Sequence, residues 1–159
     1  ATLLVRIPVP ATGGYANLGD GVILAAAFMI HPLYASLAAG VGSMMADLLA
    51  GYMQFAVGTF IIKGLMAVIA GCFFHRMKRE RQGKARFFMM VMGAVYAEIW
   101  MVMGYFAFEA VFLGFGMGAA ASIPGNAGQG IIGMAVGCTV TPILLRNSEV
   151  KNMMIKTWK

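Results

Sequence analysis

Long apolar runs separated by short polar segments dominate the chain, and their lengths predict membrane-spanning helices. About 20 apolar residues span the hydrocarbon core of a bilayer as a helix, and Phe55–Phe74 is an apolar run with a single charge, Lys63. The whole chain, 1–159, is therefore interpreted as one transmembrane domain. The expected helices are 1–8 (the end of a first helix that is truncated in this sequence), 20–31, 33–49, 55–75, 87–112 and 123–146.

The dipeptide His31-Pro32 decides between five helices and six. Residues 21–46 are apolar apart from this point, so they form either one kinked helix or two helices joined by a tight turn. Proline disrupts the interior of a helix, and it also disfavours a helical conformation of the residue before it. The sequence therefore favours six helices, although 21–31 would be only about 16 Å long at ~1.5 Å per residue, short for a full crossing.

Composition and the placement of charge support an all-α integral membrane protein. The chain is 60% hydrophobic and 11% charged, whereas about a quarter of the residues in soluble domains are charged. Six of the 12 basic residues fall between Arg76 and Arg86, and four between Arg146 and Lys159. Basic segments that flank apolar runs favour the cytoplasmic side, so the loop 75–86 and both termini of a six-helix chain are expected there.

The same distribution argues against a nucleic-acid partner, in spite of a net charge of +6. No basic segment is interleaved with aromatic side chains that could stack on bases. Cys72 and Cys138 lie in apolar runs and are interpreted as buried packing residues. No metal or cofactor site is expected.

Charged side chains within membrane helices are costly and are usually functional or paired. Glu98, Tyr105 and Glu109 share one helical face, and Lys63 lies near the outer end of its own helix. Together with amides at the start of the last helix and polar groups on the outer loops, they suit a small polar ring with hydroxyl groups. The predicted ligand-binding residues are Asn17, Tyr52, Gln54, Lys63, Tyr105, Glu109, Asn126 and Gln129.

These residues also have simpler interpretations. Lys63 could form a purely structural ion pair with Glu98 or Glu109, and Asp20 could cap the helix that it begins. The segment Gly128–Gly133 matches G-x-G-x-x-G, but no strand precedes it and it enters a membrane helix, so it is not interpreted as a dinucleotide site. The sequence has no G-x-x-x-x-G-K-[ST] motif, so this chain is not expected to hydrolyse ATP itself, and no catalytic residues are predicted.

Three ordered motifs carry a family resemblance. They are N-L-G-D at Asn17–Asp20, G-x-G-S-x-x-A-D-L-x-x-G-Y at Gly40–Tyr52, and T-F-x-x-K-G at Thr59–Gly64. The chain resembles the S component, the substrate-binding membrane subunit, of an energy-coupling factor (ECF) vitamin transporter. Within that family it looks most similar to members that handle pyridoxine or hydroxymethylpyrimidine.

The resemblance implies a six-helix S-component bundle in a bacterial cell membrane, with a high-affinity vitamin site on the outer side. It also implies three partners, a transmembrane coupling protein and two cytoplasmic ATPases that power uptake. The function expected is therefore substrate binding for an ATP-driven importer, not catalysis. The alternatives are a stand-alone proton-coupled carrier that uses Glu98 or Glu109, and a structural membrane subunit.

Overall fold

The structure, a computed structural model, describes residues 6–9, 14–76, 84–150 and 152, and helices make up most of this part of the chain. The α-helices are α1 (Gly19–Met29), α2 (Pro32–Ala50), α3 (Ala56–Arg76), α4 (Lys84–Val111) and α5 (Ile123–Leu144). Short 3-10 helices, η1 (Met53–Phe55) and η2 (Gly116–Ser122), precede α3 and α5. The predicted all-α class is confirmed, with one small β-hairpin added to it.

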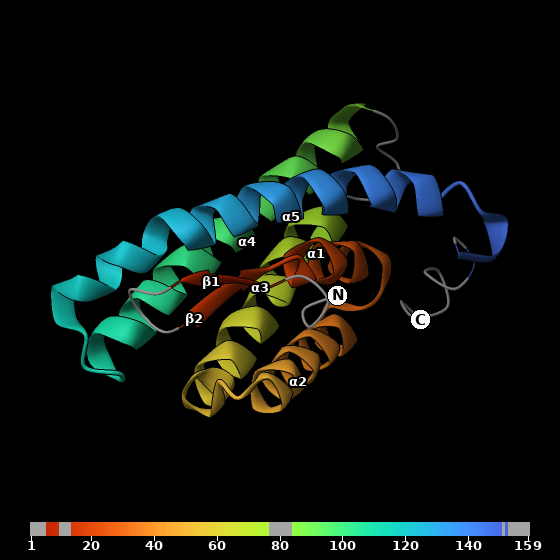
Figure 1. Cartoon of the computed structure of the whole chain (residues 1–159). Coiled ribbons are helices and arrows are strands. Elements are labelled where there is room, and N and C mark those ends of the chain that lie inside the picture. Colours follow the sequence, from red (N-terminus) through yellow and green to blue (C-terminus); the bar gives the residue numbers. More distant parts are fainter. Residues whose placement is uncertain (1–5, 10–13, 77–83, 151, 153–159) are drawn as a thin grey trace.

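Within the described residues, four helical segments are long and apolar enough to cross a membrane: Pro32–Ala50, Met53–His75, Lys84–Val111 and Gly116–Leu144. The helix α1 has 11 residues, so it is too short to span the hydrocarbon core by itself. It lies inside the bundle instead, packed against α5, α3 and α2 (Figure 1). The short helix α1 therefore packs against other helices and does not span the lipid by itself.

The chain forms two helices, not one, across 21–46. The backbone of Ile30 is extended, and His31 precedes α2 as its N-cap, with its Nδ1 accepting a hydrogen bond from the backbone N–H of Leu33 at 3.3 Å. Pro32 then occupies the first turn of α2, where a missing N–H costs nothing. The proline that suggested a break at the sequence level is thus the residue that begins the second helix.

Residues 6–8 differ from the helix expected over 1–8. They belong to strand β1 (Arg6–Val9), which pairs antiparallel with β2 (Gly14–Asn17) and places Arg6 opposite Asn17. Ile7 and Val9 are β-branched, and each precedes a proline, so both local preferences oppose a helix. Residues 1–5 lie outside the described part of the chain.

Close contacts between helices depend on small residues. On α5, a Cβ added to Gly137 would lie 2.7 Å from Cβ of Leu24, and one added to Gly133 would lie 2.7 Å from Cβ of Asp20. On α1, a Cβ at Gly21 would lie 2.6 Å from Val136. Small residues let membrane helices approach one another closely, so these glycines set the tight crossing of α1 and α5.

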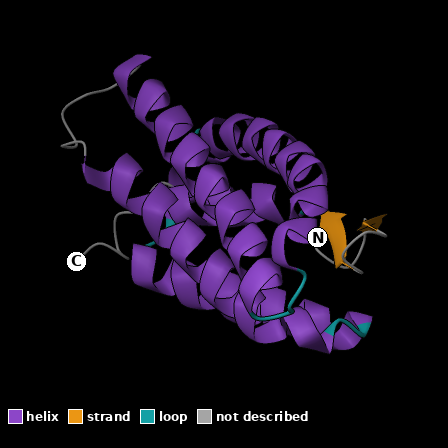
Figure 2. Cartoon of the chain, turned by 90° about the vertical axis from the view of Figure 1, so that its left-hand side faces the viewer, coloured by secondary structure: helices purple, strands orange, loops and turns teal. Residues whose placement is uncertain are grey.

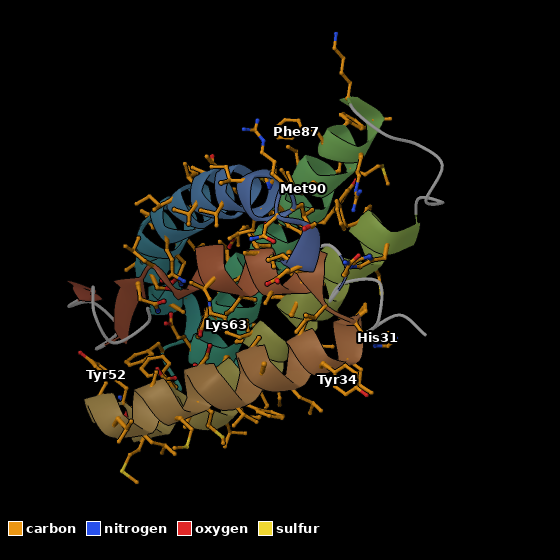
Figure 3. All side chains as sticks on the ribbon, turned by 90° about the vertical axis from the view of Figure 1, so that its right-hand side faces the viewer. His31, Tyr34, Tyr52, Lys63, Phe87 and Met90 are labelled. Carbon is orange, nitrogen blue, oxygen red and sulfur yellow. The ribbon has the colours of Figure 1, made fainter. Side chains whose placement is uncertain are left out.

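The two ends of the bundle differ. The β-hairpin lies at one end, together with Tyr52 at the turn between α2 and α3 (Figure 3). His31 lies toward the other end (Figure 3). The C-terminal end of α5, the end of α3 and the start of α4 also lie there (Figures 1 and 2). We call the first the hairpin end and the second the basic end, because Lys84, Arg86 and Arg146 begin or follow helices there.

Candidate functional site

A buried ion pair joins α1 to α3 in the interior of the bundle. Nζ of Lys63 donates to Oδ1 of Asp20, and their side chains are 2% and 0% exposed. Lys63 also lies over the ring of Tyr105, with Nζ 5.4 Å from its centroid. Removing two opposite charges from water costs several kcal/mol per ion, so the pair is an expensive feature for a small membrane protein to keep.

Asp20 is not the cap of α1. Leu18 holds the N-cap position without a side-chain hydrogen bond, while Oδ1 of Asn17 accepts from the backbone N–H of Gly19 at 2.7 Å. The carboxylate of Asp20, one residue inside the helix, is thereby left to bind Lys63. The capping interpretation of Asp20 is therefore wrong, and the cap-like contact belongs to Asn17.

Gln129 connects this ion pair to the β-hairpin. Its Nε2 donates to Oδ2 of Asp20 at 2.5 Å, and its Oε1 accepts from the backbone N–H of Asn17, the last residue of β2, at 2.7 Å. Lys63, Asp20, Gln129 and Asn17 thus form one chain of hydrogen bonds from α3 through α1 and α5 to the hairpin. A change in the buried pair can therefore alter the hydrogen bond that joins Gln129 to the hairpin.

Glu98 adds a second carboxylate beside the pair. It is 4% exposed, and neither of its oxygens has a hydrogen-bond partner among the described residues. Two glycines of α5 make room for it: a Cβ at Gly130 would lie 3.0 Å from Oε2, and one at Gly133 would lie 2.8 Å from Oε1. A Cβ at Gly133 would therefore meet both Glu98 and Asp20, so the two acidic side chains flank the same point of α5.

We call Asp20, Lys63, Glu98 and Gln129 the polar cluster. Its members come from α1, α3, α4 and α5, and every one of them is buried. The cluster holds a cation, two carboxylates and an amide, and two of its groups have spare hydrogen-bonding capacity. The ammonium of Lys63 makes one hydrogen bond within the described structure, and the carboxylate of Glu98 makes none.

Other predicted site residues lie on the same helices. The hydroxyl of Tyr105 donates to Oγ1 of Thr59 at 3.0 Å, one turn before Lys63 on α3. Asn126 is buried on α5 one turn before Gln129, and Glu109 is buried near the end of α4. The ion pair of Lys63 is with Asp20, and not with Glu98 or Glu109, the partners of the alternative interpretation drawn from the sequence.

Tyr52 and Gln54 are placed differently from the rest. Tyr52 is half-buried and Gln54 is exposed, and Figure 3 shows Tyr52 well separated from Lys63, at the hairpin end. The structure therefore does not bring these two residues to the polar cluster. The ligand roles predicted for the eight residues remain predictions.

Asp20 and Glu98 are the cluster members that the predicted set omitted. Both were visible as charges within apolar runs, which is the signal that selected Lys63 and Glu109. The position of Asp20 at the start of a helix also fits a cap, and the position of Glu98 also fits an ion pair or a proton-carrying group. A pairing across 43 residues has no local sequence signature.

Acidic, basic and amide side chains buried together in a helical membrane protein are typical of proteins that bind or move polar solutes within the bilayer. Comparison with known families identifies the family. Residues 1–146 match the ECF-type riboflavin transporter S component, and the chain belongs to that family. It is accordingly a multi-pass membrane subunit of a transport system and not an enzyme, which confirms the family resemblance seen in the three motifs.

One curated relative is an uncharacterized protein in a gap 3' region of Pyrococcus woesei. It is 38% identical over 136 residues, which is 86% of this chain and 86% of the relative. No solved structure matches the chain.

Proposed function

We propose that this chain is the high-affinity substrate-binding subunit of an ATP-driven ECF importer for a small water-soluble vitamin. The observation that carries the proposal is the polar cluster, buried within the bundle of a chain whose family consists of S components. Membrane proteins rarely retain such groups without a ligand or a partner for them. A few polar groups in an otherwise apolar site also fix the orientation of a small ligand.

The spare hydrogen-bonding capacity defines what the ligand must offer. The ammonium of Lys63 can donate to a ring carbonyl, a ring nitrogen or a hydroxyl. The carboxylate of Glu98 can accept from a ring N–H or a hydroxyl. Tyr105, Glu109 and Asn126 are proposed as further contacts, and Asn17, Tyr52 and Gln54 as contacts from the outer loops.

Several vitamins meet this requirement, because they combine a nitrogen-containing aromatic ring with hydroxyl groups. We favour riboflavin as the first ligand to test, since the matched family is described by it. Pyridoxine and hydroxymethylpyrimidine, favoured by the resemblance of the sequence alone, are the competing ligands. All three offer both donors and acceptors to Lys63 and Glu98.

The ligand must gain access to a closed cluster. All four side chains are at most 5% exposed, so binding requires the helices or the hairpin to move. Because the backbone N–H of Asn17 donates to Gln129 of the cluster, the hairpin is the element whose movement would open the cluster most directly. We infer that opening at the hairpin end admits the vitamin and that closure restores this contact.

A second function is favoured by one observation, the buried carboxylate of Glu98 without a hydrogen-bond partner among the described residues. Such a group would suit a stand-alone carrier that binds and releases a proton. Proteoliposomes separate the two functions. A binding subunit gives uptake of labelled vitamin only with a coupling protein, two ATPases and ATP, whereas a carrier gives uptake by the chain alone under a pH gradient.

A further inference from the structure

A cavity lies near the basic end of the bundle, and none of the residues of the polar cluster line it. Its volume is about 160 Å³, and it is lined by Phe74, Arg86, Phe87, Met90, Pro142 and Leu145. These residues come from α3, from the first two turns of α4 and from the last turn of α5 and the residue after it. Figure 3 shows Phe87 and Met90 on the same side of Lys63 as His31, away from Tyr52.

The cavity is amphipathic. Five of its six lining residues are apolar, and the sixth is Arg86, whose guanidinium carbon lies 4.9 Å from the centroid of the Phe74 ring. Met90 is 2% exposed and forms its floor, while Phe87 is 52% exposed and lies at its mouth. An occupant would therefore bury an apolar part against Met90 and present a polar part to Arg86.

The charge around the mouth is positive. Lys84, in the first turn of α4, and Arg146, directly after Leu145, are both exposed. The first turn of α4 also carries backbone N–H groups without partners in the helix, which favour a negative group. The buried acidic residues Asp20, Asp47 and Glu109 lie near helix ends that face the hairpin end, so they do not offset this charge. Glu149, exposed three residues after Arg146, offsets one of the basic charges and leaves the balance positive.

The surface outside the cavity indicates where the occupant comes from. Phe88, Ile143 and Leu144 are 61%, 58% and 38% exposed on the same stretches of α4 and α5. In a membrane-spanning protein such side chains face lipid, so the mouth of the cavity opens at the edge of the bilayer. Basic pockets between membrane helices near the surface are typical sites for anionic lipid headgroups.

We propose that this cavity binds an anionic phospholipid, with its phosphate at Arg86 and the upper part of an acyl chain against Met90 and Leu145. The site is separate from the polar cluster and does not depend on the identity of the vitamin. A bound lipid would hold the end of α3, the start of α4 and the end of α5 together.

Native mass spectrometry of the full chain in detergent tests the proposal, with dioleoyl phosphatidylglycerol as the probe and dioleoyl phosphatidylcholine as the neutral comparison. We expect phosphatidylglycerol to half-saturate the protein at a lower lipid concentration than phosphatidylcholine does. Arg86→Gln should raise the half-saturating concentration about fivefold, the effect of one basic residue near an anionic surface. Met90→Trp, which fills the cavity, should weaken binding at least as much. This second variant tests the proposal even if Arg86→Gln fails to fold.

Two matched variants serve as controls. Lys84→Gln removes a charge from the same helix turn without touching the cavity, and Met103→Trp adds the same bulk at a site on α4 that is 65% exposed. Lys84→Gln should weaken binding less than Arg86→Gln does, and Met103→Trp should bind phosphatidylglycerol as the parent chain does. Equal losses in Lys84→Gln and Arg86→Gln, equal binding of the two lipids, or full binding by Met90→Trp would each overturn the proposal. Binding of inorganic phosphate as tight as that of phosphatidylglycerol would also do so, because it would show that the acyl chain adds nothing.

Discussion

Lys63 and Asp20, 43 residues apart in sequence, form an ion pair in which neither side chain is more than 2% exposed. The pair fixes α1 against α3, and Gln129 extends it to α5. Three helices are thus held by one carboxylate. Because burying such a pair costs free energy, replacing one or both of its residues should change the free energy of unfolding by a measurable amount.

Removing one member of the pair should destabilise the protein more than removing both. Lys63→Met leaves Asp20 buried and uncompensated, and such a loss typically costs about 3–5 kcal/mol. The double variant Lys63→Met with Asp20→Asn should recover part of that loss. Thermal unfolding of the detergent-purified variants measures it, and a double variant whose loss equals the sum of the two single losses would show that the residues are not coupled.

Gly133→Ala should destabilise the contact between α1, α4 and α5. The added methyl group would lie 2.7 Å from Cβ of Asp20 and 2.8 Å from Oε1 of Glu98, and overpacking of this kind costs about 1–3 kcal/mol. Gly128→Ala is the matched control on the same helix, because a Cβ there meets nothing within 4 Å. If the two variants melt at the same temperature, the close crossing at Gly133 is wrong.

Gln129→Leu should loosen the hairpin, because it removes the acceptor of the Asn17 backbone N–H. Hydrogen exchange over residues 14–17 should become about tenfold faster, which corresponds to the loss of one hydrogen bond. Gln54→Leu makes the same substitution at an exposed position and should leave this exchange unchanged. Identical exchange rates in the two variants would show that the polar cluster does not stabilise the hairpin.

Glu98→Gln should distinguish a ligand contact from a structural group. Its carboxylate makes no hydrogen bond with the described residues, so loss of the charge should leave thermal stability unchanged or raise it. Affinity for the vitamin should fall about tenfold, as for loss of a charged hydrogen bond. A variant that binds the vitamin normally but loses uptake driven by a pH gradient would instead support the carrier.

Helices were predictable because each apolar run has a clear local end. Pro32 and the glycine at Gly51, which adopts φ 84°, stop or start helices by their own backbone preferences. Helix α3 is observed at Ala56–Arg76, where 55–75 was expected, and α4 at Lys84–Val111, where 87–112 was expected. The strand β1 was missed because a short apolar stretch reads as either strand or helix until its partner is known.

The polar cluster was predictable only in part. Lys63 and Gln129 stood out as polar groups in apolar surroundings, but their common partner, Asp20, is 43 and 109 residues away from them. Which charges meet depends on the crossing of α1 with α5, and that crossing is set by glycines such as Gly133. Packing of this kind has no signature in the spacing along one helix.

Calorimetric titration of the detergent-purified chain with riboflavin, pyridoxine and hydroxymethylpyrimidine tests the central claim most directly. The account predicts saturable binding of one vitamin, with one site per chain, that weakens strongly in Lys63→Met and Glu98→Gln but not in Met103→Trp, a change at an exposed position of α4. The order of the three vitamins would then name the substrate. No binding of any of them to the folded protein, or equal binding by all the variants, would contradict the assignment of the polar cluster as a vitamin site.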